Sequence, residues 1–192
     1  MKKLLVLCLA LCLTGCGRAA PPRAADGMTW SKDWVTLGNV IGVDTPEGLT
    51  ARESSDALSA DGMYYATWSA GDAVPYVNEY GEDAQLYDAQ LYVLLSGYAS
   101  TEKAEEGMEE LLSMAAERYT IEETKTEAYN GQEFTIITYA YKSETNPYAQ
   151  GVSAFGAYGN YNIIAELSCR ENFEGDALEL LEDFLEHCHY VA

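Results

Sequence analysis

The sequence predicts an α+β domain in which a mainly antiparallel sheet carries two amphipathic helices. Two kinds of pattern lead to this fold class. Apolar residues recur with helical spacing in residues 104–119 and again near the end of the chain. The dipeptides Asn130-Gly131 and Gly159-Asn160 each separate two runs of strand-forming residues, as hairpin turns do. Because hairpins join antiparallel neighbours, we expect a mainly antiparallel sheet with helices on one or both faces.

The chain before the first helix is expected to consist mostly of strands and turns. Residues 28–34 hold two tryptophans four positions apart, which fits a short helical turn or the lead-in to the domain. Turn-forming residues occupy 45–48 and 59–62, and residues 71–88 are expected to form a long loop. β-branched and aromatic runs predict the strands, at residues 35–43, 49–58, 63–70 and 89–98.

Each of the two expected helices presents one apolar stripe. The first begins after Ser100, a favourable N-cap, and the second covers residues 173–189. The first stripe consists of Ala104, Met108, Leu111, Leu112, Ala115 and Tyr119. The second consists of Ala177, Leu181, Phe184, Leu185 and Cys188. Between the helices, the two hairpins use strands at residues 121–128, 132–142, 150–158 and 161–170.

The composition is that of a globular protein with a strong excess of acid. The chain has 192 residues, 48% of them hydrophobic, and 31 Asp and Glu against 11 Lys and Arg. The length fits one domain with a real core. The formal charge of −20 argues against nucleic-acid binding, because phosphates are held by Lys and Arg. It also argues against adhesion to an anionic membrane surface by charge.

The first residues have the pattern of a secretory signal peptide. Lys2 and Lys3 are followed by an apolar run from residue 4 to 13, which is too short to span a bilayer as a helix. The segment Leu13-Thr14-Gly15-Cys16 then resembles the lipobox of bacterial lipoproteins. The resemblance implies that residues 1–15 are removed as a signal peptide and that Cys16 receives a diacylglycerol. An ordinary cleaved signal, in which Cys16 is incidental, is the alternative.

Acylation of Cys16 would place the protein outside the cytoplasm, anchored to the bacterial cell membrane. Two acyl chains hold a protein stably where one chain gives only marginal binding, so the bilayer is the first expected partner. Residues 16–27 are small and rich in alanine and proline, and we expect a flexible tether there. Residues 28–192 are then a single globular domain of the cell envelope.

The order of elements resembles the PsbP-like α/β sandwich. The parallels are a strand leading into a Pro-Glu-Gly turn (residues 43–48), a first helix followed by a long hairpin around Asn130-Gly131, and a closing strand with a C-terminal helix. The resemblance covers about residues 35–190. It implies an α/β sandwich, a fold that serves photosystem assembly, nuclear transport cofactors and bacterial lipoproteins of unknown role. The fold therefore does not identify the function.

The cysteines and histidines are expected to be structural. A helix of about 15 residues spans about 22 Å. If it folds back on the strand before it, Cys169 and Cys188 lie too far apart for a disulfide, whose Cα atoms must be within about 7 Å. We therefore favour two buried thiols, with a disulfide as the alternative. His187 and His189 bracket Cys188 on an expected helix and share no face with it, so no metal site is expected.

Sequence motifs of catalysis are missing. The chain has no Gly-x-Ser-x-Gly, no phosphate-binding Gly-x-x-x-x-Gly-Lys loop and no His-Glu-x-x-His. No enzymatic activity and no cofactor are therefore expected. The acids of residues 99–127 and 171–189 could bind Ca²⁺, but their helix-face spacing favours a solvated surface over a ligand loop.

Tyrosine is unusually frequent, with 15 residues. Tyrosine suits binding surfaces because it combines a large apolar area with a polar group. Three tyrosines of the expected loop, Tyr76, Tyr80 and Tyr87, are the candidate ligand-binding residues. The alternative is that the aromatic residues only fill a half-covered sheet. Five aromatic residues on expected strands are candidates to pave one sheet face together: Tyr64, Tyr65, Trp68, Tyr139 and Tyr141.

These observations favour a membrane-anchored extracytoplasmic lipoprotein that acts as a non-catalytic binding or accessory module. Its expected partner, besides the bilayer, is an envelope protein or a small-molecule ligand. An extracytoplasmic hydrolase that uses acidic residues, for example on glycans, is the alternative; it needs two carboxyl groups facing each other across a pocket. A spacer or assembly factor for an envelope complex is a third possibility.

Overall fold

The computed structural model describes residues 29–31, 33–52, 62–78, 80–143 and 146–190. The expected signal peptide, Cys16 and the tether lie outside the described residues, as do most of the strand expected at 49–58 and the turn after it.

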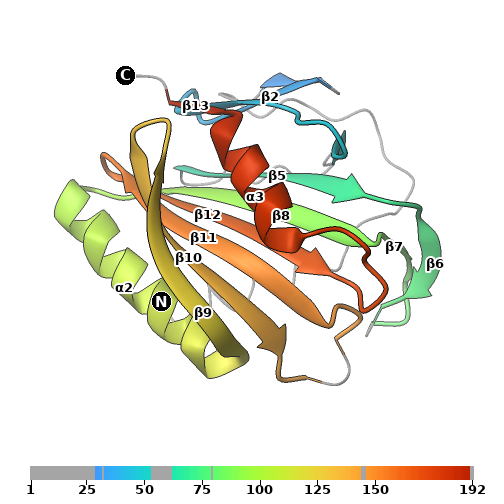
Figure 1. The fold of residues 1–192 in the computed structure, drawn as a ribbon. Helices are drawn as coiled ribbons and strands as arrows, with labels where there is room; N and C mark the ends of the chain where they lie inside the picture. Colours follow the sequence, from blue (N-terminus) through green and yellow to red (C-terminus); the bar gives the residue numbers. More distant parts are fainter. Residues whose placement is uncertain (1–28, 32, 53–61, 79, 144–145, 191–192) are drawn as a thin grey trace.

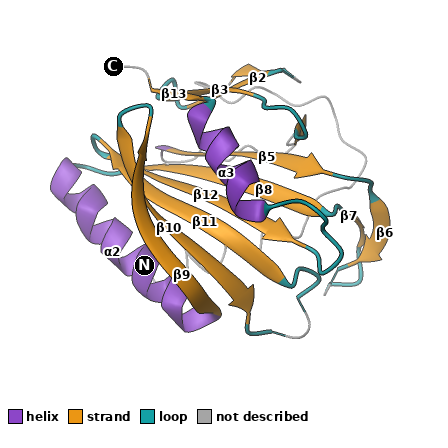
Figure 2. Cartoon of the chain, viewed as in Figure 1, coloured by secondary structure: helices purple, strands orange, loops and turns teal. Residues whose placement is uncertain are grey.

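A seven-stranded sheet forms the centre of the molecule, and every pair of neighbouring strands in it is antiparallel. In spatial order its strands are β4 (Thr50–Arg52), β5 (Met63–Ala70), β8 (Ala89–Gly97), β12 (Tyr161–Cys169), β11 (Gln150–Tyr158), β10 (Gln132–Tyr141) and β9 (Tyr119–Tyr129). Both predicted hairpins lie in this sheet, as β9–β10 and β11–β12. Figure 2 shows how the strands dominate the molecule.

Two smaller sheets and two helices complete the described fold. A four-stranded antiparallel sheet has the order β1 (Thr29–Trp30), β2 (Trp34–Leu37), β3 (Ile41–Asp44) and β13 (Cys188–Tyr190). The other elements are the hairpin of β6 (Val74–Val77) and β7 (Asp83–Leu86), and the helices α2 (Thr101–Arg118) and α3 (Ala177–Glu186). The predicted α+β class with a mainly antiparallel sheet and two packed helices is confirmed.

The two helices cover opposite faces of the seven-stranded sheet. Successive side chains of a strand point to opposite faces, and both faces are apolar here. On β10, Ile136 belongs to the core that contains α3, whereas its neighbour Ile137 belongs to the core under α2. On β12, Ala165 and Ile164 divide in the same way. In Figure 1, α3 crosses the sheet with the four-stranded sheet along the edge beside it.

The larger core lies between the seven-stranded sheet, α3 and the four-stranded sheet. Trp68 is fully buried at its centre, and its ring meets the edge of Phe184 of α3 with 4.9 Å between centroids. Its indole N–H donates to Thr45 Oγ1 at 3.2 Å, so the polar atom of this large ring is satisfied. Val35 and Val43 of the four-stranded sheet belong to the same core. Trp68 thus joins three layers that are distant in sequence.

The first helix begins as predicted. Ser100 is its N-cap, and the hydroxyl of this residue accepts a hydrogen bond from the Lys103 N–H. Ala104 and Ala115 of the predicted stripe are buried. At the other end, Lys142 Nζ donates to the carbonyl oxygens of Ala116 and Glu117 at 3.0 and 3.1 Å. A cation therefore satisfies carbonyl groups at the negative end of the helix dipole.

The predicted strand at residues 35–43 is wrong, because the chain reverses in its middle. Gly38 and Asn39 both have positive φ, at +61° and +53°, and separate β2 from β3. Gly and Asn are the residues that adopt this left-handed conformation at least cost, so the run of apolar residues makes two short strands. The helical turn considered at residues 28–34 is also not found, since Thr29–Trp30 pairs with β2 as β1.

The predicted loop at residues 71–88 is also corrected. Residues Val74–Val77 and Asp83–Leu86 pair as the antiparallel hairpin β6–β7. Pro75 does not prevent this, because no third strand of the described residues pairs with the hairpin and a proline is tolerated at a sheet edge.

The last helix is shorter than predicted. It spans Ala177–Glu186, with the Asp176 side chain as N-cap to the N–H groups of Leu178 and Glu179. Cys188 does not extend the helical stripe; it lies in β13, which pairs with β3. The chain leaves the helix because β3 offers an unpaired edge whose hydrogen bonds β13 satisfies. Leu181, Phe184 and Leu185 are buried as predicted.

The predicted Asn-Gly turn links the β9–β10 hairpin to the end of α3. Asn130 and Gly131 have φ of +51° and +82°, as a two-residue hairpin turn requires. The Asn130 side chain also donates to the carbonyl oxygens of Glu186 at 2.7 Å and Cys188 at 2.9 Å. One residue therefore sets the turn and caps the helix that packs on the sheet.

Replacement of Asn130 by glycine separates these two roles. Glycine keeps the positive φ but removes both hydrogen bonds, so Asn130→Gly should lower the free energy of unfolding by about 1–3 kcal/mol. The matched control is Asn39→Gly, at an exposed turn residue with φ of +53°; its effect should be a few tenths of a kcal/mol, as expected for a turn change alone. Urea unfolding measures both. Equal losses would contradict the capping role.

Candidate functional site

The three tyrosines proposed as ligand-binding residues lie on the β6–β7 hairpin but do not converge on one point. Tyr76 is opposite Ala84 in the body of the hairpin. Tyr80 lies at the tip and is 56% exposed. Tyr87 follows β7; its ring lies under the Arg52 guanidinium, with 4.3 Å from Cζ to the ring centroid. Of the three, Tyr80 alone is exposed, while Tyr76 and Tyr87 are half-buried.

The tip of this hairpin is held by a buried asparagine. Asn78 is 5% exposed, and its Oδ1 accepts the N–H groups of Tyr80 at 3.0 Å and Glu82 at 2.9 Å. Its Nδ2 donates to Glu82 Oε2 at 3.0 Å. This arrangement fixes the backbone on both sides of the tip, while Val77 and Tyr80 stay 58% and 56% exposed. The hairpin therefore presents two apolar side chains on a preorganised tip, which stands away from α2 in Figure 1.

The five aromatic residues expected to pave one sheet face are divided between the two faces. Trp68 is in the core under α3, and Tyr64 packs against that core. Tyr139 and Tyr141 belong to the core under α2, and Tyr65 contacts Tyr92 with ring centroids 5.5 Å apart. The division follows from strand alternation, because Tyr64 and Tyr65 are neighbours on β5.

A carboxyl group lies among tyrosines beneath the C-terminal end of α2. Glu166 of β12 is half-buried, and its two oxygens accept hydrogen bonds from the hydroxyls of Tyr119 at 3.2 Å and Tyr141 at 3.3 Å. Tyr141 also shares a hydrogen bond of 2.7 Å with Ser168. Tyr119 stacks on Tyr139 with 3.9 Å between ring centroids. The cluster joins the α2–β9 junction to the centre of the sheet.

Burial raises the pKa of Glu166, while the nearby Arg118 and the hydrogen bonds from Tyr119 and Tyr141 lower it in part. Burial also raises the pKa of Tyr139 and Tyr141 well above the ordinary value for tyrosine. Sequence reasoning missed this cluster. Its signal in the sequence is a glutamate within a strand of mostly apolar residues, 161–169.

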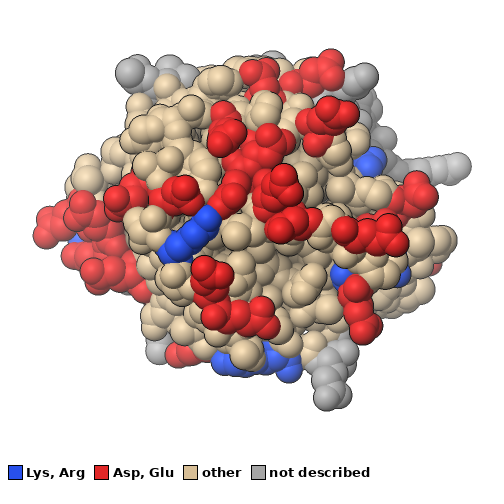
Figure 3. Space-filling view, in the orientation of Figure 1, with Lys and Arg blue, Asp and Glu red and all other residues tan. Residues whose placement is uncertain are grey.

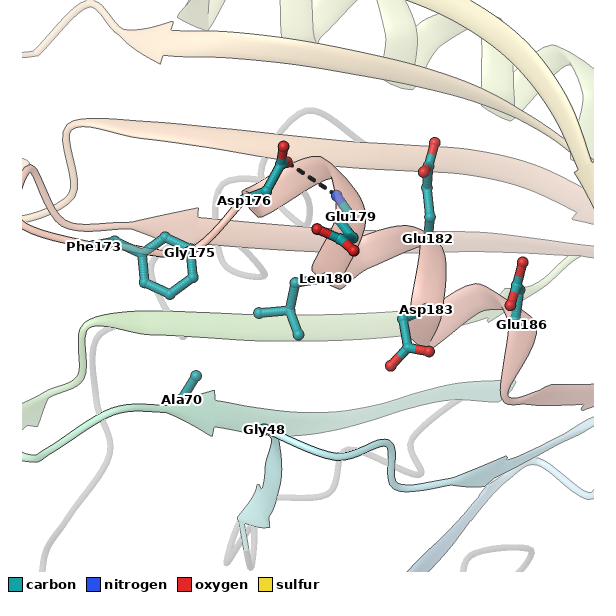
Figure 4. A pocket seen from close by; sticks show the side chains of 10 residues that line it. All are labelled: Gly48, Ala70, Phe173, Gly175, Asp176, Glu179, Leu180, Glu182, Asp183 and Glu186. Atoms are coloured by element: carbon teal, nitrogen blue, oxygen red, sulfur yellow. Dashed lines mark hydrogen bonds between the residues drawn. The ribbon is translucent and has the colours of Figure 1, made fainter.

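The acids of α3 border a surface groove of about 560 Å³. Figure 4 shows Phe173, Leu180 and Ala70 between α3 and β5, with Glu182 and Glu186 directed to the other side of the helix. Three of these acids already have partners within the chain. Asp176 caps the helix, Glu182 pairs with Lys125 of β9, and Asp183 lies 3.6 Å from His187. Acidic side chains gather over α3 and along α2 in Figure 3, as expected for solvated helix faces.

The histidines and cysteines have structural contacts. His187 Nδ1 lies 2.7 Å from the carbonyl oxygen of Asp183, and His189 pairs with Asp44 at 3.0 Å. Cys169 and Cys188 are buried free cysteines, and burial raises the pKa of each thiol to about 12. Among the described residues, no group of three or more His, Cys, Asp or Glu side chains is arranged to hold a metal ion. In the same part of the chain, no helix combines the length and apolar character needed to cross a bilayer.

Comparison with known proteins finds similarity at the level of structure alone. No family model matches the chain, and no curated protein matches it. A solution structure of cyanobacterial PsbP (CyanoP) from Synechocystis sp. PCC 6803 is similar with a TM-score of 0.46 and 12% identity, covering 93% of this chain and 99% of that one. A crystal structure from Bacteroides thetaiotaomicron VPI-5482 has a TM-score of 0.41 and 7% identity, covering 81% of this chain and 47% of that one.

A PsbP-like structure is therefore among the structural neighbours of this chain, as the order of its elements suggested. At these identities and TM-scores, the likeness carries no conclusion about activity, ligands or partners.

The raised pKa of Glu166 predicts a specific pH dependence of stability. In the folded protein the Glu166 carboxyl group stays protonated to a higher pH than in the unfolded chain, where the pKa of this side chain is near 4.5. Glu166 therefore makes the free energy of unfolding fall as pH rises from that value through the raised pKa. Glutamine does not titrate. The free energy of unfolding of Glu166→Gln, minus that of the unmodified protein, should therefore be more favourable at pH 7 than at pH 4.

Urea unfolding at the two pH values measures this difference. Glu109→Gln, at an exposed position of α2, is the control for removal of a surface charge. A Glu166→Gln difference that is equal at pH 4 and pH 7 would contradict the raised pKa.

Proposed function

We propose that this protein is a membrane-anchored extracytoplasmic lipoprotein of the bacterial envelope that acts as a non-catalytic binding or accessory module. It is held at the membrane by acyl chains on Cys16, and it meets an envelope partner with the tip of the β6–β7 hairpin. The two halves of the proposal have separate support and separate tests.

The anchoring half is supported by the N-terminal sequence. A positive start, an apolar run and Leu13-Thr14-Gly15-Cys16 occur in the order that lipoprotein signals have. The acid-rich domain has a strong negative formal charge, which would repel an anionic bilayer surface. A covalent lipid supplies the membrane affinity that such a surface lacks.

The binding half rests on one observation, the exposed apolar pair on a fixed hairpin tip. Val77 and Tyr80 are two of the three large hydrophobic residues that are exposed in the described part of the chain. Tyrosine is enriched among the residues that dominate protein–protein binding energy. Because Asn78 already holds the tip, binding there costs little additional ordering of the chain.

Binding is preferred to acid-dependent hydrolysis because of where the carboxyl groups lie. Glu166, whose pKa is raised by burial, hydrogen-bonds to the hydroxyls of Tyr119 and Tyr141, and the charged neighbour that affects its pKa is the cation Arg118. Three of the five acids beside the α3 groove cap the helix or pair with Lys125 and His187. A glycan hydrolase would instead hold two carboxyl groups on either side of a bound substrate.

Cys16→Ser tests the anchor. Without the thiol no diacylglycerol can be attached, so the protein should move from the membrane fraction to the soluble fraction of lysed cells. Incorporation of labelled palmitate into the purified protein should be lost at the same time. Retention of the variant in the membrane fraction would contradict acylation as the anchor.

A photo-crosslinking residue at position 80 tests the hairpin. In the native cells it should give a discrete adduct, and Val77→Ser should weaken the adduct about fivefold or more, as expected when a side chain that contributes over 1 kcal/mol to binding is lost. The same crosslinker at Glu109, exposed on α2, is the matched control. Equal adducts from both positions, or an adduct insensitive to Val77→Ser, would contradict docking through the tip.

A further inference from the structure

The strand β9 ends the seven-stranded sheet with a long exposed edge. It spans Tyr119–Tyr129 and pairs with β10 along one side. Within the described residues no strand lies on its other side, and most residues between its two ends are exposed. β9 and the β6–β7 hairpin lie in different parts of the molecule in Figure 1, so an inference about β9 does not rest on the function proposed for the hairpin.

The register shows which backbone groups of β9 point outward. Tyr129 and Gln132 flank the two-residue turn, and such flanking residues exchange both hydrogen bonds with each other. The pattern alternates along an antiparallel pair, and the register is unbroken from this turn back to Glu123. The N–H and C=O groups of Thr124, Thr126 and Ala128 therefore point away from β10. They form a regular row of donors and acceptors that an added strand would match.

The usual steric protections of an edge are absent from this stretch. It contains no proline, and the irregularity in the pairing of β9 with β10 lies beyond it, next to Tyr139. Charge is the protection that remains. Glu122, Glu123 and Glu127 lie along the strand, and the single lysine, Lys125, already pairs with Glu127 and with Glu182 of α3.

The charges indicate which occupant this edge accepts. A second copy of the chain would carry the same formal charge of −20, and repulsion between two such acidic surfaces opposes pairing of two copies. A strand with lysine or arginine would meet complementary charge from β9 and from the acids of α3 beside it. Figure 3 shows the acidic side chains gathered over α3.

We propose that β9 binds an extended cationic segment of a partner protein, which adds to the sheet as an eighth strand along Thr124–Ala128. Main-chain hydrogen bonds supply part of the affinity in this mode of recognition, and the side chains supply the selectivity. The strong negative charge of the whole protein opposes self-association, and the acids of β9 and α3 favour a basic partner.

Synthetic peptides of ten residues test the proposal with the purified full chain. The probe alternates lysine and valine; a lysine–proline peptide of equal charge cannot donate the backbone hydrogen bonds, and a glutamate–valine peptide reverses the charge. Fluorescence anisotropy should show binding of the lysine–valine peptide at least tenfold tighter than binding of either control. Equal affinity for the lysine–proline peptide would mean adsorption by charge alone and would overturn the proposal.

Amide hydrogen exchange locates the contact in the unmodified protein. The N–H groups of Thr124, Thr126 and Ala128 should exchange fast in the free protein and at least tenfold more slowly with the lysine–valine peptide. Protection confined to other residues would overturn the proposal, as would a dimer of the free chain in which these three groups are already protected.

Thr126→Pro provides the matching variant. It removes an N–H that β10 does not use, so the sheet should survive, and affinity for the lysine–valine peptide should fall about tenfold. Thr126→Val keeps the N–H and should bind within about threefold of the unmodified protein. Equal losses in both variants would assign the effect to the side chain and overturn strand addition.

Discussion

The whole architecture depends on a seven-stranded sheet that is apolar on both faces. Such a sheet is stable in water only if both faces are covered. Helix α2 covers one face, and α3 together with the four-stranded sheet covers the other. The buried Trp68 shows how closely the second arrangement is joined, since its ring contacts α3 and its N–H bonds to Thr45 beside the four-stranded sheet. Folding therefore brings the N-terminal strands and the last helix together.

Two local networks of hydrogen bonds satisfy polar groups near the ends of the two helices. Glu166 lies beneath α2 with the hydroxyls of Tyr119 and Tyr141, and Asn130 satisfies two carbonyl groups at the end of α3. Each network joins a helix end to the sheet. Because a buried polar group without a partner is costly, these residues specify where each helix ends as well as how it packs.

Acidic residues and exposed apolar residues lie in different parts of the surface. Ten of the 31 Asp and Glu residues lie on α2 and α3, where Glu182 pairs with Lys125, and Asp176 caps α3. Within the described ranges, the exposed large hydrophobic side chains are Val77 and Tyr80 at the β6–β7 tip and Ile121 of β9. Both proposed contact surfaces lie at such peripheral elements, while the centre of the sheet is used for packing.

Local patterns were sufficient for the fold class, for α2 and its N-cap, for both hairpins and for the buried stripe of α3. These features depend on spacing and turn chemistry among residues close in sequence. Local patterns gave a wrong prediction where the same run of residues fits two different structures. The apolar run from Val35 to Val43 could be one strand or two, and the positive φ of Gly38 and Asn39 decided it.

The alternation of strands and amphipathic helices, the strong negative charge and the resemblance of residues 13–16 to a lipobox can all be read from the order of residues. Three features emerge only in the folded chain: α2 and α3 lie on opposite faces of the sheet, Glu166 lies among tyrosines, and residues 188–190 leave the helix to pair with β3. The reason is physical. Helical and strand periodicity report which side of an element is apolar, but which distant element covers that side depends on contacts between residues far apart in the chain.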